Sequence, residues 1–87
     1  RPVIMALIIK NDQYTGHADG IRFDLDKMNK YVTFTFAEDR RPSPQKLSGI
    51  ARQLFGESTT KARENISRDY LDRPMIHAKY VRTQYTS

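Results

Sequence analysis

Two carboxylates in the N-terminal half of the chain have a spacing that could support metal chemistry. Asp24 and Asp26 are two residues apart, so a β-strand would place both on one face, roughly 6.5–7 Å apart. Such carboxylates can hold Mg²⁺ for phosphodiester hydrolysis, and Asp12 and Asp19 precede them. The same alternation is also typical of a solvent-exposed strand face. We therefore rank a metal-dependent nuclease third among the hypotheses and expect no metal or cofactor.

Other catalytic groups are sparse. The chain has no cysteine, and neither of its two histidines, His17 and His77, has an acidic or nucleophilic neighbour at a recognisable motif spacing. No phosphate-loop, dinucleotide-binding or zinc-protease motif occurs in the sequence. We therefore expect a binding protein rather than an enzyme.

The positive charge is concentrated in the C-terminal part of the chain. The 87 residues include 15 Lys and Arg against 10 Asp and Glu, which gives a formal net charge of +5. Residues 1–38 are balanced in charge, so the whole excess lies in residues 39–87. A one-sided positive field attracts phosphates or acidic proteins. No apolar run reaches about 18 residues, so we expect no membrane span.

The elements that must position these groups begin with strands. The apolar run over residues 3–9 predicts a central strand buried on both faces. Residues 11–20 are polar and rich in turn formers, and they predict a long loop. Apolar residues alternate with polar ones over 21–26 and again over 31–36. This period of two predicts a β-hairpin.

The middle of the chain predicts two helices. Ser43 and Pro44 are suited to a helix start, and Gly56 is suited to the left-handed residue that ends a helix. An apolar stripe with helical spacing lies between them, formed by Leu47, Ile50, Ala51, Leu54 and Phe55. A second helix is predicted from Ser58 or Thr59 up to Pro74, with Ala62, Ile66 and Tyr70 on its buried side.

The tail, residues 75–87, favours a strand because it contains several aromatic and β-branched residues, although part of it also fits a helical face. The predicted fold is therefore a single α+β domain over residues 1–87, with two helices packed on one face of a small, mostly antiparallel sheet. The expected order is β-β-β-α-α-β. Its parts are the sheet with its hairpin (1–36), a connector (37–45), the helix pair (46–73) and the C-terminal strand or tail (75–87).

The predicted helix pair resembles a helix-turn-helix motif. The resemblance depends on Ala51, on Gly56 in the turn, and on Ala62 with Ile66 on the buried side. It implies that the second helix enters the major groove of DNA. The motif is imperfect, since the second helix also carries acidic residues such as Glu64; an ordinary pair of antiparallel helices is the alternative. The residues predicted to contact nucleic acid are Arg40, Arg41, Arg52, Thr59, Thr60, Lys61, Arg63, Arg68, Lys79 and Arg82.

These observations favour a small, basic, nucleic-acid-binding domain, with DNA preferred over RNA, in the cytoplasm, nucleoid or nucleus. Basic residues interleaved with Tyr80 and Tyr85 in the tail would also suit base stacking on a sheet surface, as in proteins that bind single strands or RNA. The alternative is a protein-interaction module, an inhibitor or adaptor that binds an acidic partner. Homodimerisation through a free strand edge also stays open.

Overall fold

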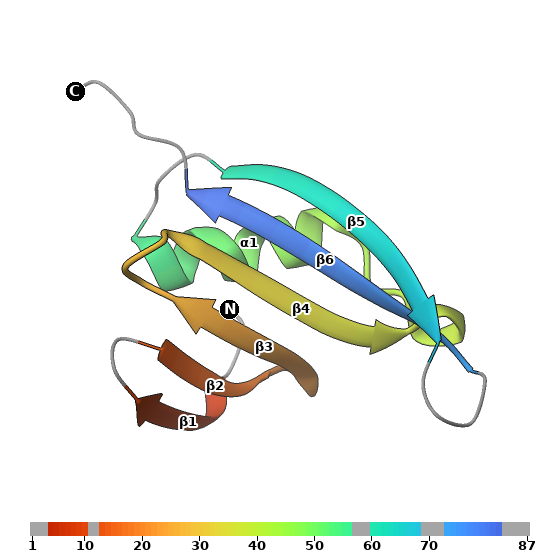
Figure 1. The fold of residues 1–87 in the computed structure, drawn as a ribbon, viewed down its shortest axis with the longest axis horizontal. Helices are drawn as coiled ribbons and strands as arrows, with labels where there is room; N and C mark the ends of the chain where they lie inside the picture. Colours follow the sequence, from red (N-terminus) through yellow and green to blue (C-terminus); the bar gives the residue numbers. More distant parts are fainter. Residues whose placement is uncertain (1–3, 11–12, 57–59, 69–72, 83–87) are drawn as a thin grey trace.

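The computed structural model describes residues 4–10, 13–56, 60–68 and 73–82. These residues form six β-strands, a short 3₁₀-turn and one α-helix, in the order β-β-β-β-α-β-β (Figure 1). The elements are β1 (Ile4–Lys10), β2 (Gln13–Ala18), β3 (Ile21–Asp26), β4 (Tyr31–Ala37), η1 (Glu38–Arg40), α1 (Pro44–Phe55), β5 (Thr60–Arg68) and β6 (Pro74–Arg82).

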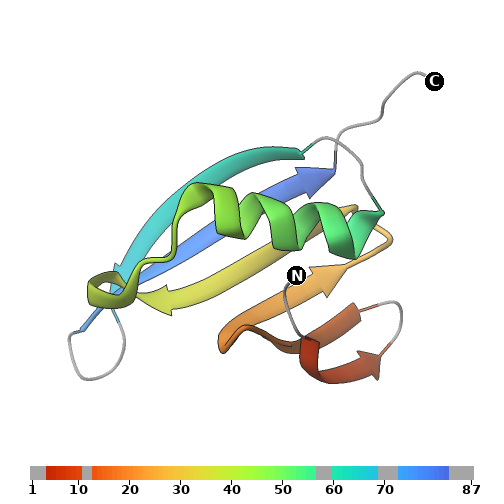
Figure 2. The ribbon, with the colours of Figure 1, turned by 180° about the vertical axis from the view of Figure 1, so that it is seen from behind.

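All six strands belong to one antiparallel sheet, in the order β1-β2-β3-β4-β6-β5. The first four strands form a meander, and the last strand, β6, is inserted between β4 and β5. Helix α1 lies on one face of this sheet and packs against β5 and β6 (Figure 2). The predicted fold class, with two helices on the sheet, is therefore wrong, because the described residues contain a single α-helix.

The error lies in the segment predicted to be the second helix, most of which forms β5. A spacing of four places Ala62 and Ile66 on one side of a helix, but it also places them on one side of a strand, because four is an even number. The strand is selected by pairing with β6, which runs from Thr60 opposite Arg82 to Arg68 opposite Pro74. The described residues therefore contain neither the helix-turn-helix motif nor the alternative pair of antiparallel helices.

The N-terminal elements also differ from the prediction. The apolar segment β1 is at the edge of the sheet instead of its centre. The segment predicted to be a loop contains β2, which pairs with β3 through a two-residue turn at Asp19 and Gly20. Both turn residues have positive φ, 52° and 78°, which is the conformation of a type I′ hairpin turn. The Asp-Gly pair was the sequence signal for this hairpin.

Three predicted elements are confirmed. The hairpin forms as β3 and β4, and the predicted tail forms a strand, β6, as far as Arg82; Tyr85 lies outside the described residues. Helix α1 begins after Ser43, whose hydroxyl accepts a hydrogen bond of 3.1 Å from the backbone N–H of Lys46. It ends at Gly56, which is left-handed with φ 76°. Its 12 residues are too few to cross a membrane, and no helix in the described part of the chain meets that requirement.

The core lies between α1 and the face of the sheet that α1 covers. Alternate residues of β3, β4 and β6 point into it because side chains of a strand alternate between faces. Phe34 and Tyr80 meet edge to face, with ring centroids 5.6 Å apart, and burial together with the nearby Glu64 raises the pKa of Tyr80. The core residues of these three strands and of the helix are Phe23, Leu25, Val32, Phe34, Phe36, Ile76, Ala78, Tyr80, Leu47, Ile50 and Ala51.

Candidate functional site

The opposite face of the sheet is not covered by the helix, and we call it the open face (Figure 1). Strand pairing sets the alternate residues of neighbouring strands beside one another in rows. One row runs Asp24, Thr33, Lys79, Arg63, and the next runs Arg22, Thr35, His77, Asn65. Residues of this face that the structure describes include Arg22, Asp24, Asp26, Tyr31, Thr33, Thr35, Arg63, Asn65, Ser67, His77, Lys79 and Val81.

An aromatic residue and a cation are paired on β4 and β6 of the open face. The ammonium nitrogen of Lys79 lies 4.0 Å from the ring centroid of Tyr31. A cation over an aromatic face is attracted by the ring quadrupole, by about 0.5–1 kcal/mol at an exposed site. The contact therefore holds a flat ring and a positive charge next to each other on a surface that solvent can reach.

A histidine is fixed by hydroxyl groups on the strands at either side of it. The Nδ1 atom of His77 is 3.3 Å from the hydroxyl oxygen of Thr35, and its Nε2 atom is 2.7 Å from that of Ser67. A neutral imidazole donates through one nitrogen and accepts through the other, and a hydroxyl can do either. A serine beside a histidine also resembles a nucleophile and its base, but the third member here is a neutral hydroxyl. A hydroxyl does not stabilise an imidazolium as a carboxylate does, so the cluster is best described as a hydrogen-bonding surface.

The two carboxylates considered for metal binding are engaged in other interactions. Asp24 lies 3.5 Å from the guanidinium of Arg22. Asp26 is 6% exposed and accepts hydrogen bonds from the backbone N–H of Asn29 at 2.9 Å and from its side-chain amide at 3.0 Å. The backbone N–H of Asn29, followed by its amide, lowers the pKa of Asp26. Within the described ranges, no group of three or more potential ligands is arranged to hold a metal ion.

The structure brings two of the predicted contact residues together on the open face. Arg63 and Lys79 are cross-strand partners on β5 and β6. Thr60 and Lys61 occupy the first two positions of β5, and Thr59 lies outside the described residues.

The other predicted residues are dispersed. Arg41 forms an ion pair of 2.9 Å with Glu64, and Arg52 is exposed on α1, on the far side of the sheet from the open face. Arg68 and Arg82 are at the last positions of β5 and β6, at opposite ends of the sheet. The predicted site therefore does not form one surface.

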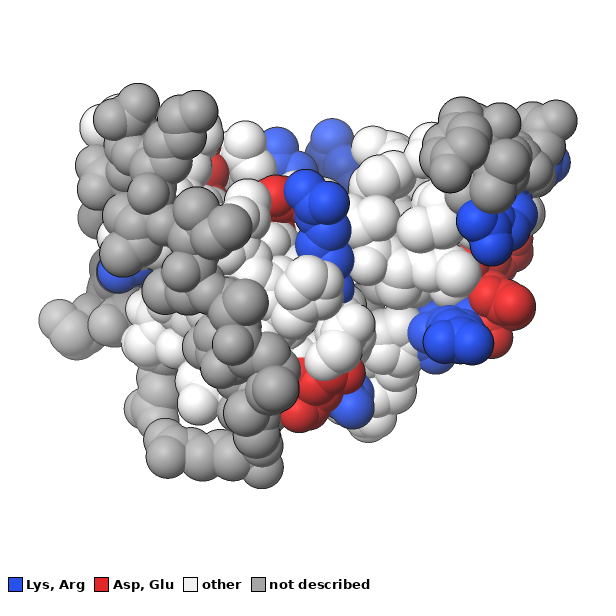
Figure 3. Space-filling view, turned by 90° about the horizontal axis from the view of Figure 1, so that it is seen from below, with Lys and Arg blue, Asp and Glu red and all other residues white. Residues whose placement is uncertain are grey.

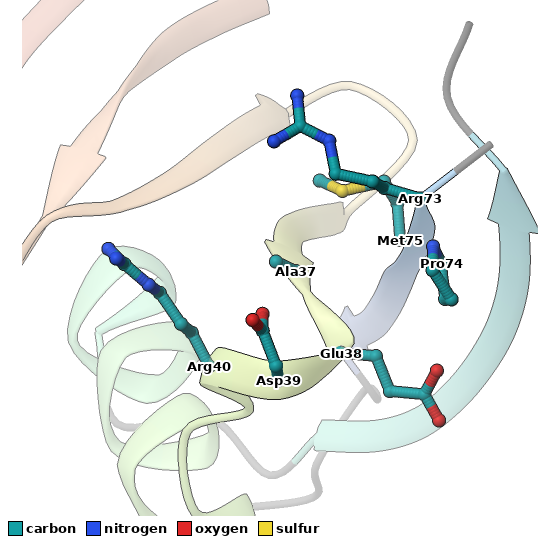
Figure 4. A pocket seen from close by; sticks show the side chains of 7 residues that line it. All are labelled: Ala37, Glu38, Asp39, Arg40, Arg73, Pro74 and Met75. Carbon is teal, nitrogen blue, oxygen red and sulfur yellow. The ribbon is translucent and has the colours of Figure 1, made fainter. Parts of the chain in front are cut away.

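Arg40 contributes to a pocket of about 830 Å³ where β4 leads into η1 and β6 begins. In this pocket Asp39 points between Arg40 and Ala37, whereas Glu38 is turned toward β5 (Figure 4). Arg73 lies on the other side (Figure 4). The described residues that line the pocket include two acidic and two basic ones, so they show no charge preference that would select an anion.

Tyr31, Thr35 and His77 were missed as site residues. The signal that could have found them is the period of two: the residues between the apolar positions of a strand must share the other face. Arg22 has Asp24 as a partner, and Asp26 also lies at an open-face position, so Arg63 and Lys79 leave only a small cationic excess on the described open face. In the view from below, basic side chains lie close to acidic ones in mixed patches on the described surface (Figure 3).

No protein-family model matches the chain, and neither curated proteins nor solved structures give a significant match. Its function is therefore inferred from its own residues.

Proposed function

We propose that this domain binds single-stranded nucleic acid across the open face of its sheet. The observation that carries the proposal is the pair formed by Tyr31 and Lys79, 4.0 Å from ring to ammonium on an uncovered sheet. Proteins that bind single strands combine aromatic rings, on which bases stack, with cations that neutralise the backbone.

The neighbouring side chains fit the same partner. His77, Thr35 and Ser67 supply hydrogen-bonding groups beside the aromatic pair, and such groups can reach the edges of unstacked bases or a ribose hydroxyl. Arg63 adds a second positive charge next to Lys79. The net charge of +5 favours association with a polyanion.

A single strand suits this surface better than a duplex. Duplex DNA is usually recognised by an element that enters the major groove. Most of the segment predicted to be a helix in that role forms the strand β5 instead. Stacking on Tyr31 requires a base that is not already stacked within a double helix. We therefore expect weaker binding to duplex DNA than to single-stranded RNA or DNA.

The test is fluorescence anisotropy with labelled single-stranded RNA, single-stranded DNA and duplex DNA at two salt concentrations. We expect Tyr31→Ala to weaken single-strand binding by about 5- to 150-fold, since stacking of one base contributes about 1–3 kcal/mol. Lys79→Gln should lower the slope of log K against log salt by about 0.7, the value for one phosphate contact with a single strand.

Arg52→Gln is the matched control, because it removes one exposed positive charge from the helix on the other side of the sheet. It should leave both affinity and slope nearly unchanged. The proposal is overturned if no single strand binds at low salt, or if Tyr31→Ala and Lys79→Gln bind as the wild type does.

A second candidate is strand addition by an acidic peptide at the edge strand β5. The observation that favours it is Ile66, which is 64% exposed on this edge; edge strands can pair with an added strand. A synthetic peptide of alternating Glu and Val should then shift the backbone amide NMR signals of β5 and leave those of β3 unchanged. Shifts spread over both strands, or none, would exclude this mode.

A further inference from the structure

A small pocket with three cationic side chains lies at the end of the sheet where β3 turns into β4. It has a volume of about 170 Å³ and is lined by Lys27, Lys30, Arg82, Leu54 and Phe55. The two lysines come from the β3–β4 turn, the arginine from the end of β6, and the two apolar residues from the last turn of α1. No acidic residue is among the described residues that line it.

Backbone contacts bring the cations to this place. The turn is fixed because Asp26 accepts hydrogen bonds from Asn29, and Lys30 adopts a left-handed conformation with φ 62°. The carbonyl of Lys30 then accepts a hydrogen bond of 2.7 Å from the backbone N–H of Arg82. The ammonium of Lys27 leans toward the helix-covered side, 5.3 Å from the ring centroid of Tyr14.

The end of the helix does not neutralise this charge. A helix C-terminus carries roughly half a negative charge, whereas Lys27 and Lys30 alone contribute two positive charges. One carbonyl of the last helical turn, that of Arg52, also accepts a hydrogen bond from the N–H of Gly56. The carboxylate of Asp26, in the same turn, contributes one further negative charge, so a net positive charge remains and would attract an anion to the pocket.

The pocket lies at the same end of the sheet as Tyr31, on the side that the helix covers. Tyr31 and Val81 are cross-strand partners on that face, and Lys30 and Arg82 are their neighbours in sequence. A strand that lies along β4 and β6 and stacks on Tyr31 would reach the pocket with its terminus by passing around the end of the sheet at the β3–β4 turn. A terminal phosphate carries about −1.5 to −2 charges near pH 7, against one for an internal phosphodiester, so it matches the charges of the two lysines better.

From these observations we infer that the pocket binds the terminal phosphate of the single strand that the open face holds. The inference rests on the proposed function because it requires the open face to hold the strand. Binding of a phosphate to the pocket does not itself require that function. A phosphate group is compact enough for this volume, and its oxygens accept charge-assisted hydrogen bonds from lysine and arginine. The apolar wall formed by Leu54 and Phe55 would limit the site to the end of a chain.

The experiment compares one oligonucleotide sequence with a 5′-phosphate, with a 3′-phosphate and with hydroxyl groups at both ends. We expect one phosphorylated form to bind about tenfold more tightly than the hydroxyl form, as an additional charge-assisted hydrogen bond would provide. The double variant Lys27→Gln with Lys30→Asn should abolish this difference. Asparagine tolerates the left-handed conformation of residue 30, so the turn is kept.

The control is Arg40→Gln with Arg73→Gln, which removes two charges at the opposite end of the sheet and should retain the discrimination. Equal affinities for all three oligonucleotides, or a difference that survives in the lysine variant, would overturn the inference.

A nucleoside monophosphate and inorganic phosphate are titrated separately, following the backbone amides of residues 27–30 and 82 by NMR. Shifts at these amides without oligonucleotide binding would support a phosphate site and refute the open-face proposal. The absence of shifts, together with equal oligonucleotide affinities, would refute the phosphate site alone.

Discussion

The two faces of the sheet are built from the same strands but have different properties. On β4, Val32, Phe34 and Phe36 are buried beneath the helix, whereas the residue that precedes them, Tyr31, points to the open face and contacts Lys79. Neighbouring residues therefore differ in role: one set stabilises the fold, and the other is available for a ligand. Substitutions one or a few positions apart should separate stability from binding.

The largest difference is expected between Phe34→Ala and Tyr31→Ala. Phe34 has no exposed surface, and removing a buried phenylalanine side chain costs about 3–5 kcal/mol. Tyr31→Ala removes a half-buried ring and a cation–π contact, which should cost about 1 kcal/mol. Urea unfolding followed by circular dichroism measures both. Equal losses would contradict the assignment of the two faces.

The next comparison is between two isoleucines that are cross-strand partners on β5 and β6. Ile76 has no exposed surface, and its partner Ile66 is 64% exposed. Ile76→Ala should lower the free energy of unfolding by about 2–5 kcal/mol, and Ile66→Ala by about 0.5 kcal/mol or less. In the structure Ile66 lies on an edge strand. A large loss in the free energy of unfolding for Ile66→Ala would contradict this position and support the predicted helix with Ile66 in the core.

A smaller effect is expected at the start of the helix that separates the two faces. Ser43→Ala removes the acceptor for the backbone N–H of Lys46 and should cost about 1 kcal/mol. For a domain of this size, the melting temperature would fall by about 4–8 °C. Ser48→Ala, inside the helix, is the matched control and should not lower it. If both variants have the melting temperature of the wild type, the hydrogen bond from Lys46 to Ser43 does not stabilise the helix.

The smallest effect concerns Asp26, which occupies an open-face position but binds Asn29 in the turn. The pKa of Asp26 is lowered below its ordinary value of 3.8, so the ionised carboxylate stabilises the folded state. This contribution is fully present above pH 3.8 and disappears as the pH falls through the lower pKa of the folded state. Asp26→Asn should therefore be less stable than the wild type at pH 7.

The difference between Asp26→Asn and the wild type should shrink as the pH approaches 2. Urea unfolding at a series of pH values measures it. A constant difference from pH 7 to pH 2 would show that the charge of Asp26 does not contribute to stability.

Local sequence signals were sufficient to predict elements whose structure depends on residues within the element itself. The period of two over 21–26 and 31–36 predicted β3 and β4, and the serine, proline and glycine around the first helix predicted α1. These signals depend on the backbone conformation of single residues and on the alternation of side chains. Both can be read within one element.

The segment that forms β5 could not be predicted in this way, because its apolar positions fit both a helix and a strand. Glu64 and Arg68 also have the spacing of a helical ion pair, yet in the structure Glu64 binds Arg41, 23 residues away in sequence. Pairing with β6 decides the outcome, and that partner lies beyond the segment itself.

The candidate site was predictable only in part. Lys79 and Arg63 were identified by charge, but Tyr31 and His77 were not, because their importance depends on which strands become neighbours. His77 contacts Thr35, 42 residues away in sequence. Such a cluster becomes visible only when the order of the strands is known.

The insertion of β6 between β4 and β5 has a consequence for the kinetics of folding. Within the meander of β1 to β4, each strand pairs with the strand before or after it in the chain, so the meander can form from contacts of short sequence separation. The pairing of β4 with β6 must instead close a loop that includes the whole helix and β5. Because closing long loops slows folding, we expect docking of the β5–β6 hairpin onto β4 to limit the folding rate. Under that order of events, Tyr31 and Lys79 are brought together only in the last step.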